Sequence, residues 1–108
     1  MRLLLDESVP VKLRRSLPGH DVRTVVEVGW SGVKNGSLLA LAAAARFDAF
    51  ITVDRNLPYQ QNLAALPIAV VVLGALSNEL NALLGLIPRL EVALSALQPR
   101  TYVLVEDA

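Results

Sequence analysis

Residues 50–58 read Phe-Ile-Thr-Val-Asp-Arg-Asn-Leu-Pro, an apolar, β-branched run that ends at Asp54 and then turns. The chain opens with a similar stretch, because residues 3–5 are all leucine and are followed by Asp6. Short apolar runs bounded by Asp, Asn and Pro are typical of buried strands in parallel sheets. Ligands of open α/β sheets bind beyond the carboxyl ends of the strands. If these two strands are neighbours, Asp6 and Asp54 face each other at the candidate site.

The composition indicates one domain over residues 1–108, since 54% of the residues are hydrophobic and 19% are charged, which excludes disorder. The chain has no cysteine, and this excludes disulfides, zinc–thiolate sites and thiol nucleophiles. The formal net charge is zero, so binding to nucleic acid depends on a local basic patch. No apolar run reaches membrane-spanning length and the first residues do not resemble a signal peptide. We therefore expect a cytoplasmic protein without membrane contact.

Strand and helix patterns alternate along the chain. Strands are predicted at 2–5, 20–28, 50–53, 68–73 and 101–105, and helices at 10–17, 59–66, from Asn35 or Ser37 to 46, and from Ser77 or Asn78 to 97. Pro88 lies within the last helix and should kink it or divide it in two. The alternation predicts an α/β fold, a three-layer sandwich with a mainly parallel sheet of four to five strands. Right-handed crossovers suggest the strand order 2-1-3-4, with the fifth strand extending or capping the edge.

Two carboxylates at adjacent strand ends suit a hard cation such as Mg²⁺ or Mn²⁺, which prefers oxygen ligands. Asp6 and Asp54 are the candidate metal ligands, and Asn56 can add an amide oxygen or orient a water. A phosphodiester is the natural substrate class, because a bound metal polarises the phosphate and activates a water. The alternative is that the two aspartates and Asn56 are ordinary turn and cap residues, which are common at such positions.

Several stretches together resemble a known family, the short PIN-like domains, which are compact relatives of the PIN nucleases found as toxins of toxin–antitoxin pairs. The resemblance runs from Arg2 to about Leu97 and is carried by residues 3–10, 18–25, 29–32, 34–39 and 51–57. It implies a Mg²⁺- or Mn²⁺-dependent ribonuclease, RNA as the substrate and an antitoxin as a partner. By this resemblance Asp6 matches the first acid of the family and Asp54 the later acid at a strand end.

The chain departs from the family at the start of the helix after the glycine loop, where Asn35, Gly36 and Ser37 replace the usual acid. With that carboxylate missing, the resemblance implies weaker metal binding and a weak or inactive nuclease. Asn35 or Ser37 can supply an oxygen ligand or simply cap the helix. The candidate RNA-binding residues can form a basic rim for phosphates, although most such charges only form a solvated surface; they are Arg14, Arg15, Lys34 and Arg55, with Lys12 and Arg23 beside them.

Two other functions remain open. A catalytically silent PIN-like module would bind an antitoxin or form a homo-oligomer through the apolar helix at 78–97, unless that helix only covers the sheet. A receiver-like phosphoacceptor domain would use Asp6 and Glu7 after the first strand and Asp54 after the third, followed by Pro58. Such domains also need a lysine at the end of the fifth strand, where this chain has Glu106 and Asp107.

Overall fold

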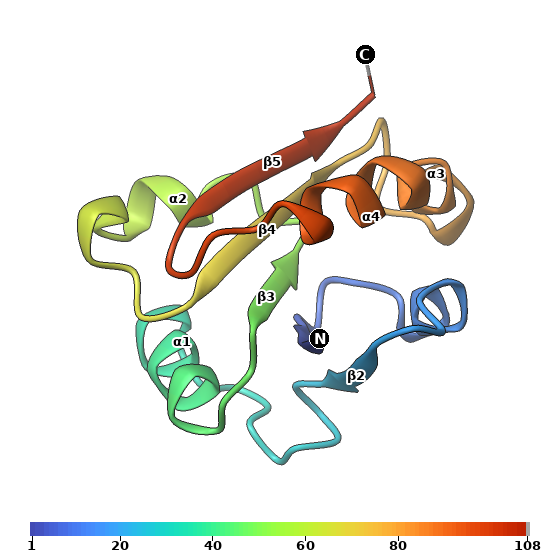
Figure 1. The fold of residues 1–108 in the computed structure, drawn as a ribbon. Coiled ribbons are helices and arrows are strands. Elements are labelled where there is room, and N and C mark those ends of the chain that lie inside the picture. Colours follow the sequence, from blue (N-terminus) through green and yellow to red (C-terminus); the bar gives the residue numbers. More distant parts are fainter. Residues whose placement is uncertain (108) are drawn as a thin grey trace.

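The computed structural model describes residues 1–107 and contains a five-stranded sheet in which all neighbouring strands are parallel (Figure 1). The order is β2-β1-β3-β4-β5, so the predicted order 2-1-3-4 is confirmed and the fifth strand extends the sheet beyond the fourth. The strands are β1 (Arg2–Leu5), β2 (Asp21–Thr24), β3 (Ala49–Thr52), β4 (Ala69–Gly74) and β5 (Tyr102–Glu106).

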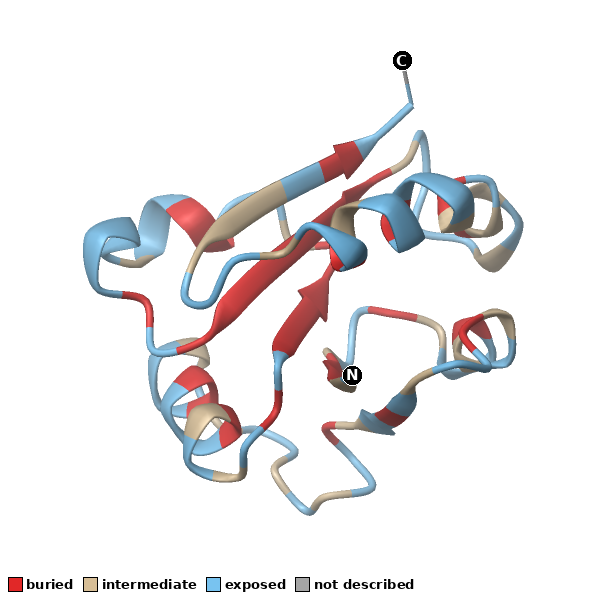
Figure 2. Ribbon diagram, in the orientation of Figure 1, coloured by how far each residue is buried: buried red, intermediate tan, exposed pale blue. Residues whose placement is uncertain are grey.

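Helices cover both faces of the sheet, which confirms the three-layer α/β architecture. They are η1 (Val11–Ser16), α1 (Asn35–Ala44), α2 (Leu57–Gln60), η2 (Leu63–Ala65), α3 (Leu80–Leu84) and α4 (Ile87–Ser95). One core lies between the sheet and η1, α3 and α4, and the other lies between the sheet and α1 and α2. The central strands β3 and β4 are buried along their whole length, as Figure 2 shows, because both of their faces are covered.

Three predicted elements differ from the structure. The helix expected at 10–17 is a 3₁₀ helix with Pro10 as its N-cap, and neither Asp6 nor Ser8 caps it. The strand expected at 20–28 ends at Thr24, because the chain then turns and the N–H of residue 28 donates to the Thr24 carbonyl. The helical piece expected at 59–66 is two short helices, α2 and η2, of which α2 begins at Leu57.

The predicted long helix at 78–97 is divided into α3 and α4, and Pro88 lies in the first turn of α4. Proline is tolerated there because the first helical N–H groups have no partner within the helix. The two helices place Leu83, Leu86, Leu90 and Leu94 in the core, each no more than 2% exposed. These four leucines of the face proposed as a contact for a second copy therefore pack within the fold, whereas Val92 of the same face is 70% exposed.

Among the residues that the structure describes, no helix has both the length and the apolar character needed to cross a membrane.

Candidate functional site

The pairing of β1 with β3 brings the two predicted acids to the same edge of the sheet. Leu5 lies beside Ile51, and the N–H of Asp6 donates to the Ile51 carbonyl at 2.9 Å, which extends the ladder by one residue. Asp6 therefore lies beside Thr52. Because paired residues of neighbouring strands point to the same face, Asp6 and Thr52 belong to one face of the sheet, and Asp54 follows two residues after the end of β3.

Thr52 links the two acids. Its side chain is fully buried, and its hydroxyl donates to Oδ2 of Asp6 at 2.8 Å. The same hydroxyl oxygen accepts a hydrogen bond from the backbone N–H of Asp54 at 3.1 Å. Ser8 adds a second hydroxyl on the Asp6 carboxylate, since its Oγ donates to Oδ2 at 2.7 Å. The Asp6 carboxylate and the Asp54 backbone are thus held in fixed positions relative to each other.

Both acids also stabilise the turns that follow their strands, as the alternative interpretation expected. Oδ1 of Asp6 accepts the N–H of Glu7, and Oδ1 of Asp54 accepts the N–H of Asn56, each at 2.9 Å. Neither acid caps a helix, because η1 has Pro10 and α2 has Asn56 as N-cap, without a side-chain cap bond. Oδ2 of Asp54 makes no hydrogen bond within residues 1–107. Turn formation therefore leaves carboxylate oxygen available for a ligand.

Asp6 and Asp54 line one open cleft of about 930 Å³ at the carboxyl edge of the sheet. Most of its lining side chains carry oxygen; these are Asp6, Glu7, Ser8, Asn35, Asp54, Asn56, Ser77 and Asn78. Oε1 of Glu7 accepts the N–H of Gly32, which ties the glycine loop to the end of β1. Over residues 1–107, no three acidic, histidine or cysteine side chains lie close enough together to hold one metal ion. An ion in the cleft thus depends on two carboxylates, amide oxygens and water.

Arg55 is the one basic residue among the described residues that line the cleft. Its guanidinium donates to the Ala75 carbonyl at 3.4 Å and lies 3.8 Å from the carboxylate of Glu106. Gly74 leaves room for this guanidinium, since a Cβ there would lie 3.0 Å from Nη2 of Arg55. A glycine at the end of β4 therefore lets the arginine lie across the strand end. Glu106 occupies the place where a receiver domain would need its lysine.

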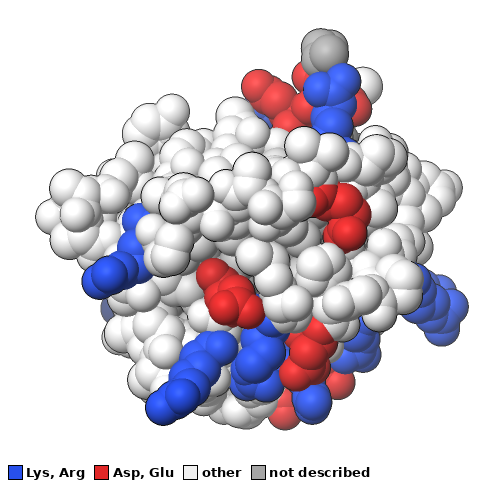
Figure 3. Space-filling model, in the orientation of Figure 1, with Lys and Arg blue, Asp and Glu red and all other residues white. Residues whose placement is uncertain are grey.

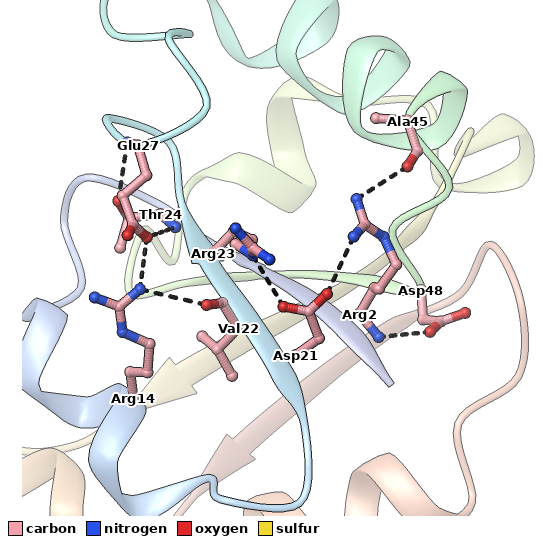
Figure 4. A network of polar contacts seen from close by, with 9 residues as sticks. All are labelled: Arg2, Arg14, Asp21, Val22, Arg23, Thr24, Glu27, Ala45 and Asp48. Carbon is pink, nitrogen blue, oxygen red and sulfur yellow. Dashed lines mark hydrogen bonds and ion pairs between the residues drawn. The ribbon is translucent and has the colours of Figure 1, made fainter.

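The other predicted basic residues do not line this cleft. Figure 4 shows Arg14 donating to Glu27 and to the Val22 carbonyl, and Arg23 paired with Asp21. These pairs balance charge around β2, where charged side chains of both signs gather in the lower part of Figure 3. Arg15 and Lys34 are exposed and also lie outside the lining of the cleft. The structure thus brings Arg55 together with the acids and leaves Arg14, Arg15 and Lys34 apart from them.

Asn35 lines the cleft at the position where the resemblance led us to expect an acid. It is the first residue of α1, whose N-cap is Lys34, so neither Asn35 nor Ser37 caps the helix. The Asn35 side chain makes no hydrogen bond within residues 1–107, whereas Ser37 is exposed and does not line the cleft. Asn35 is therefore the residue of this segment that can face a ligand.

Trp30 does not lie free in the glycine loop. Its ring meets the ring of Phe47 edge to face, with 6.2 Å between the ring centroids, and it packs against the core beneath α1. Trp30 therefore contributes to the core on this side of the sheet.

Thr52 was not among the predicted site residues. Its bond to Asp6 depends on the pairing of β1 with β3, which no local pattern marks.

The chain was compared with models of known protein families, with curated proteins and with solved structures, and none of the three comparisons finds a match.

Proposed function

We propose that this protein is a Mg²⁺- or Mn²⁺-dependent ribonuclease of PIN-like type in which Asp6 and Asp54 hold the metal. The observation that carries the proposal is the hydrogen-bonded link through Thr52, which fixes the Asp6 carboxylate relative to the backbone of Asp54 beside the cleft that both acids line. A purely structural pair of turn aspartates has no need of a buried hydroxyl between them. The link supports a function that depends on the relative position of the two acids.

The donor set fits a hard cation. The Asp6 carboxylate accepts three hydrogen bonds and Asp54 accepts one, so both keep lone pairs for a ligand. Mg²⁺ is commonly held by one or two carboxylates together with substrate phosphates and water. When bound, such an ion polarises a phosphate and lowers the pKa of a coordinated water. Two carboxylates without a third acid favour an ion that binds together with the substrate.

The remaining residues of the cleft suit a phosphodiester. Arg55 offers guanidinium N–H groups for a phosphate oxygen beside the acids. Asn35, Asn56 and Asn78 supply amide groups that can orient water or contact the sugar. The choice of RNA, and of a toxin held in check by an antitoxin, rests on the resemblance to PIN-like domains described above.

The decisive experiment measures cleavage of single-stranded RNA and of matched DNA by the purified protein with Mn²⁺, with Mg²⁺ and with EDTA. The variants Asp6→Asn and Asp54→Asn keep the size of each side chain and remove its charge. Asp48→Asn is the matched control, because Asp48 lies at the opposite edge of the sheet and needs only an oxygen to accept the Arg2 N–H. Far-UV circular dichroism and thermal unfolding show that each variant is folded.

We expect metal-dependent cleavage of RNA by the wild type and by Asp48→Asn, and loss of cleavage in Asp6→Asn and Asp54→Asn. Mn²⁺ should also raise the unfolding temperature of the wild type, since a ligand that binds the native state stabilises it. Cleavage that survives Asp54→Asn contradicts the role assigned to this carboxylate. Mn²⁺ binding without any cleavage would instead favour the catalytically silent module.

A further inference from the structure

The two edges of the sheet differ in how they are protected. The edge strand β2 has four residues, and Asp21 in it pairs with both Arg2 and Arg23 at 3.1 and 2.9 Å (Figure 4). A short edge that carries charge opposes the addition of another strand. The β2 edge is therefore unsuited to pairing with a second chain.

The β5 edge carries one charged residue, Glu106 at its end, and is otherwise apolar or aromatic. It has five residues, Tyr-Val-Leu-Val-Glu, without proline or lysine, and no described strand pairs with its outer side. Figure 1 shows β5 as the outermost strand of the sheet. An unprotected apolar edge strand is a template for pairing with another strand.

The hydrogen-bonding groups on this edge follow from the register. The N–H of Val70 donates to the Thr101 carbonyl at 2.8 Å, and Val71 of β4 lies beside Val103 of β5. Because ladder bonds alternate along a strand, the backbone groups of residues 101, 103 and 105 face β4. Those of Tyr102, Leu104 and Glu106 face away from the sheet, and the Leu104 side chain is 39% exposed.

The charges along β5 favour one orientation of a partner strand. Arg100 precedes the strand, and Glu106 and Asp107 end it, so one end is basic and the other acidic. A parallel copy would bring like charges together, whereas an antiparallel copy brings Arg100 beside the acidic end of its partner. We propose that β5 pairs antiparallel with β5 of a second copy of this chain about a two-fold axis, which joins the two sheets into one.

The proposed contact is small, because β5 has five residues. A five-residue strand pair by itself buries less than the roughly 800 Å² per partner of a standard stable interface. The dimer is therefore expected to be reversible and to dissociate on dilution. This contact does not use the cleft and does not depend on nuclease activity.

Sedimentation velocity of the full chain over micromolar to submillimolar concentrations tests the proposal. Leu104→Lys places a charge on the edge, and Leu104→Pro removes an N–H that the monomer does not use, which edge strands tolerate. Val92→Lys is the matched control, because Val92 is 70% exposed on α4. We expect concentration-dependent dimers for the wild type and the control, and folded monomers for both Leu104 variants. A wild type that stays monomeric throughout overturns the proposal, as does a folded Leu104→Lys variant that dimerises like the wild type.

The absence of cysteine allows a second test that does not rely on destabilising the contact. In Leu104→Cys the new thiol lies close to its copy in the dimer, so a short bis-maleimide should give a covalent dimer. Leu76→Cys is the control, since Leu76 is fully exposed in the segment between β4 and α3. Equal cross-linking at both positions would contradict pairing through β5.

Discussion

Replacing Thr52 by valine tests the central feature of the candidate site. The change keeps the shape of the side chain and removes the hydroxyl that donates to Asp6 at 2.8 Å and accepts from the Asp54 N–H at 3.1 Å. Thr52 is fully buried, so its two former partners lose a bond at a position that water reaches poorly. Hydrogen bonds to charged groups contribute about 1.5–3 kcal/mol, and an unsatisfied buried donor costs about 1–3 kcal/mol.

The half-buried Asp6 keeps its bonds from Ser8 and Glu7. We therefore expect Thr52→Val to lower the free energy of unfolding by about 2 kcal/mol, a value within both ranges. For a domain of about this size, such a loss lowers the unfolding temperature by roughly 8–16 °C. Thr52→Ser is the matched control, because it keeps the hydroxyl and loses a methyl group, at a cost of about 1 kcal/mol.

Urea and thermal unfolding followed by circular dichroism measure both variants, with and without Mn²⁺. We expect Thr52→Ser to keep the rise in unfolding temperature on adding Mn²⁺ and Thr52→Val to lose most of it. The reasoning is refuted if Thr52→Val is as stable as the wild type and responds equally to Mn²⁺. The hydroxyl would then contribute nothing to the position of the two acids.

Three further predictions follow from the charges and the close contacts. Arg55→Ala should weaken RNA binding in a fluorescence-anisotropy titration, because Arg55 is the one basic residue among the described residues that line the cleft. Gly74→Ala should weaken it less, since its Cβ would lie 3.0 Å from Nη2 and the guanidinium need move only a few tenths of an ångström. Binding of Arg55→Ala at wild-type strength would exclude a role for this arginine. The hydrogen bond from Arg23, together with the charges of Arg23 and Arg2, lowers the pKa of the Asp21 carboxyl below 3.8. The ionised Asp21 therefore stabilises the fold above pH 3.8, and this stabilisation is lost as the pH falls through the lowered pKa. In denaturant titrations from neutral to acidic pH, the free energy of unfolding of Asp21→Asn should fall less than that of the wild type. An identical dependence on pH in the two proteins would contradict this. Burial raises the pKa of the Tyr102 phenol above 10.0, so stability should fall as the pH rises past 10, and Tyr102→Phe should reduce that loss in alkaline unfolding experiments.

Much of the fold was predictable because its signals are local. Apolar, β-branched runs marked β3, β4 and β5, a run of leucines marked β1 and partial alternation marked β2, although β2 ends at Thr24. The right-handedness of crossovers indicated the order that the structure confirms. The position of Asp6 and Asp54 at the ends of their strands was also readable, since a parallel sheet brings all its carboxyl ends to one edge. The division of the last helix followed from Pro88, which cannot donate a backbone hydrogen bond.

Other features depended on contacts between residues far apart in the chain. The sequence alone could not assign Arg14 to Glu27 or Arg23 to Asp21, so it grouped both arginines with a basic rim. It also left open whether the apolar helix at 78–97 was an interface or a cover for the sheet, because both require the same leucines. Burial of these leucines is decided by what packs against them.

Local pattern thus determined the strands and the acids at their ends, because short-range sterics and hydrophobic periodicity act within a few residues. The strand order came instead from the general handedness of crossovers. Only the tertiary structure placed Thr52 between Asp6 and Asp54. The hydrogen bond from Thr52 to Asp6 joins residues 46 positions apart, and it forms because β1 and β3 pair in one register. A shift of that register by one residue would turn the acid away from the hydroxyl, since side chains alternate between the two faces of a sheet.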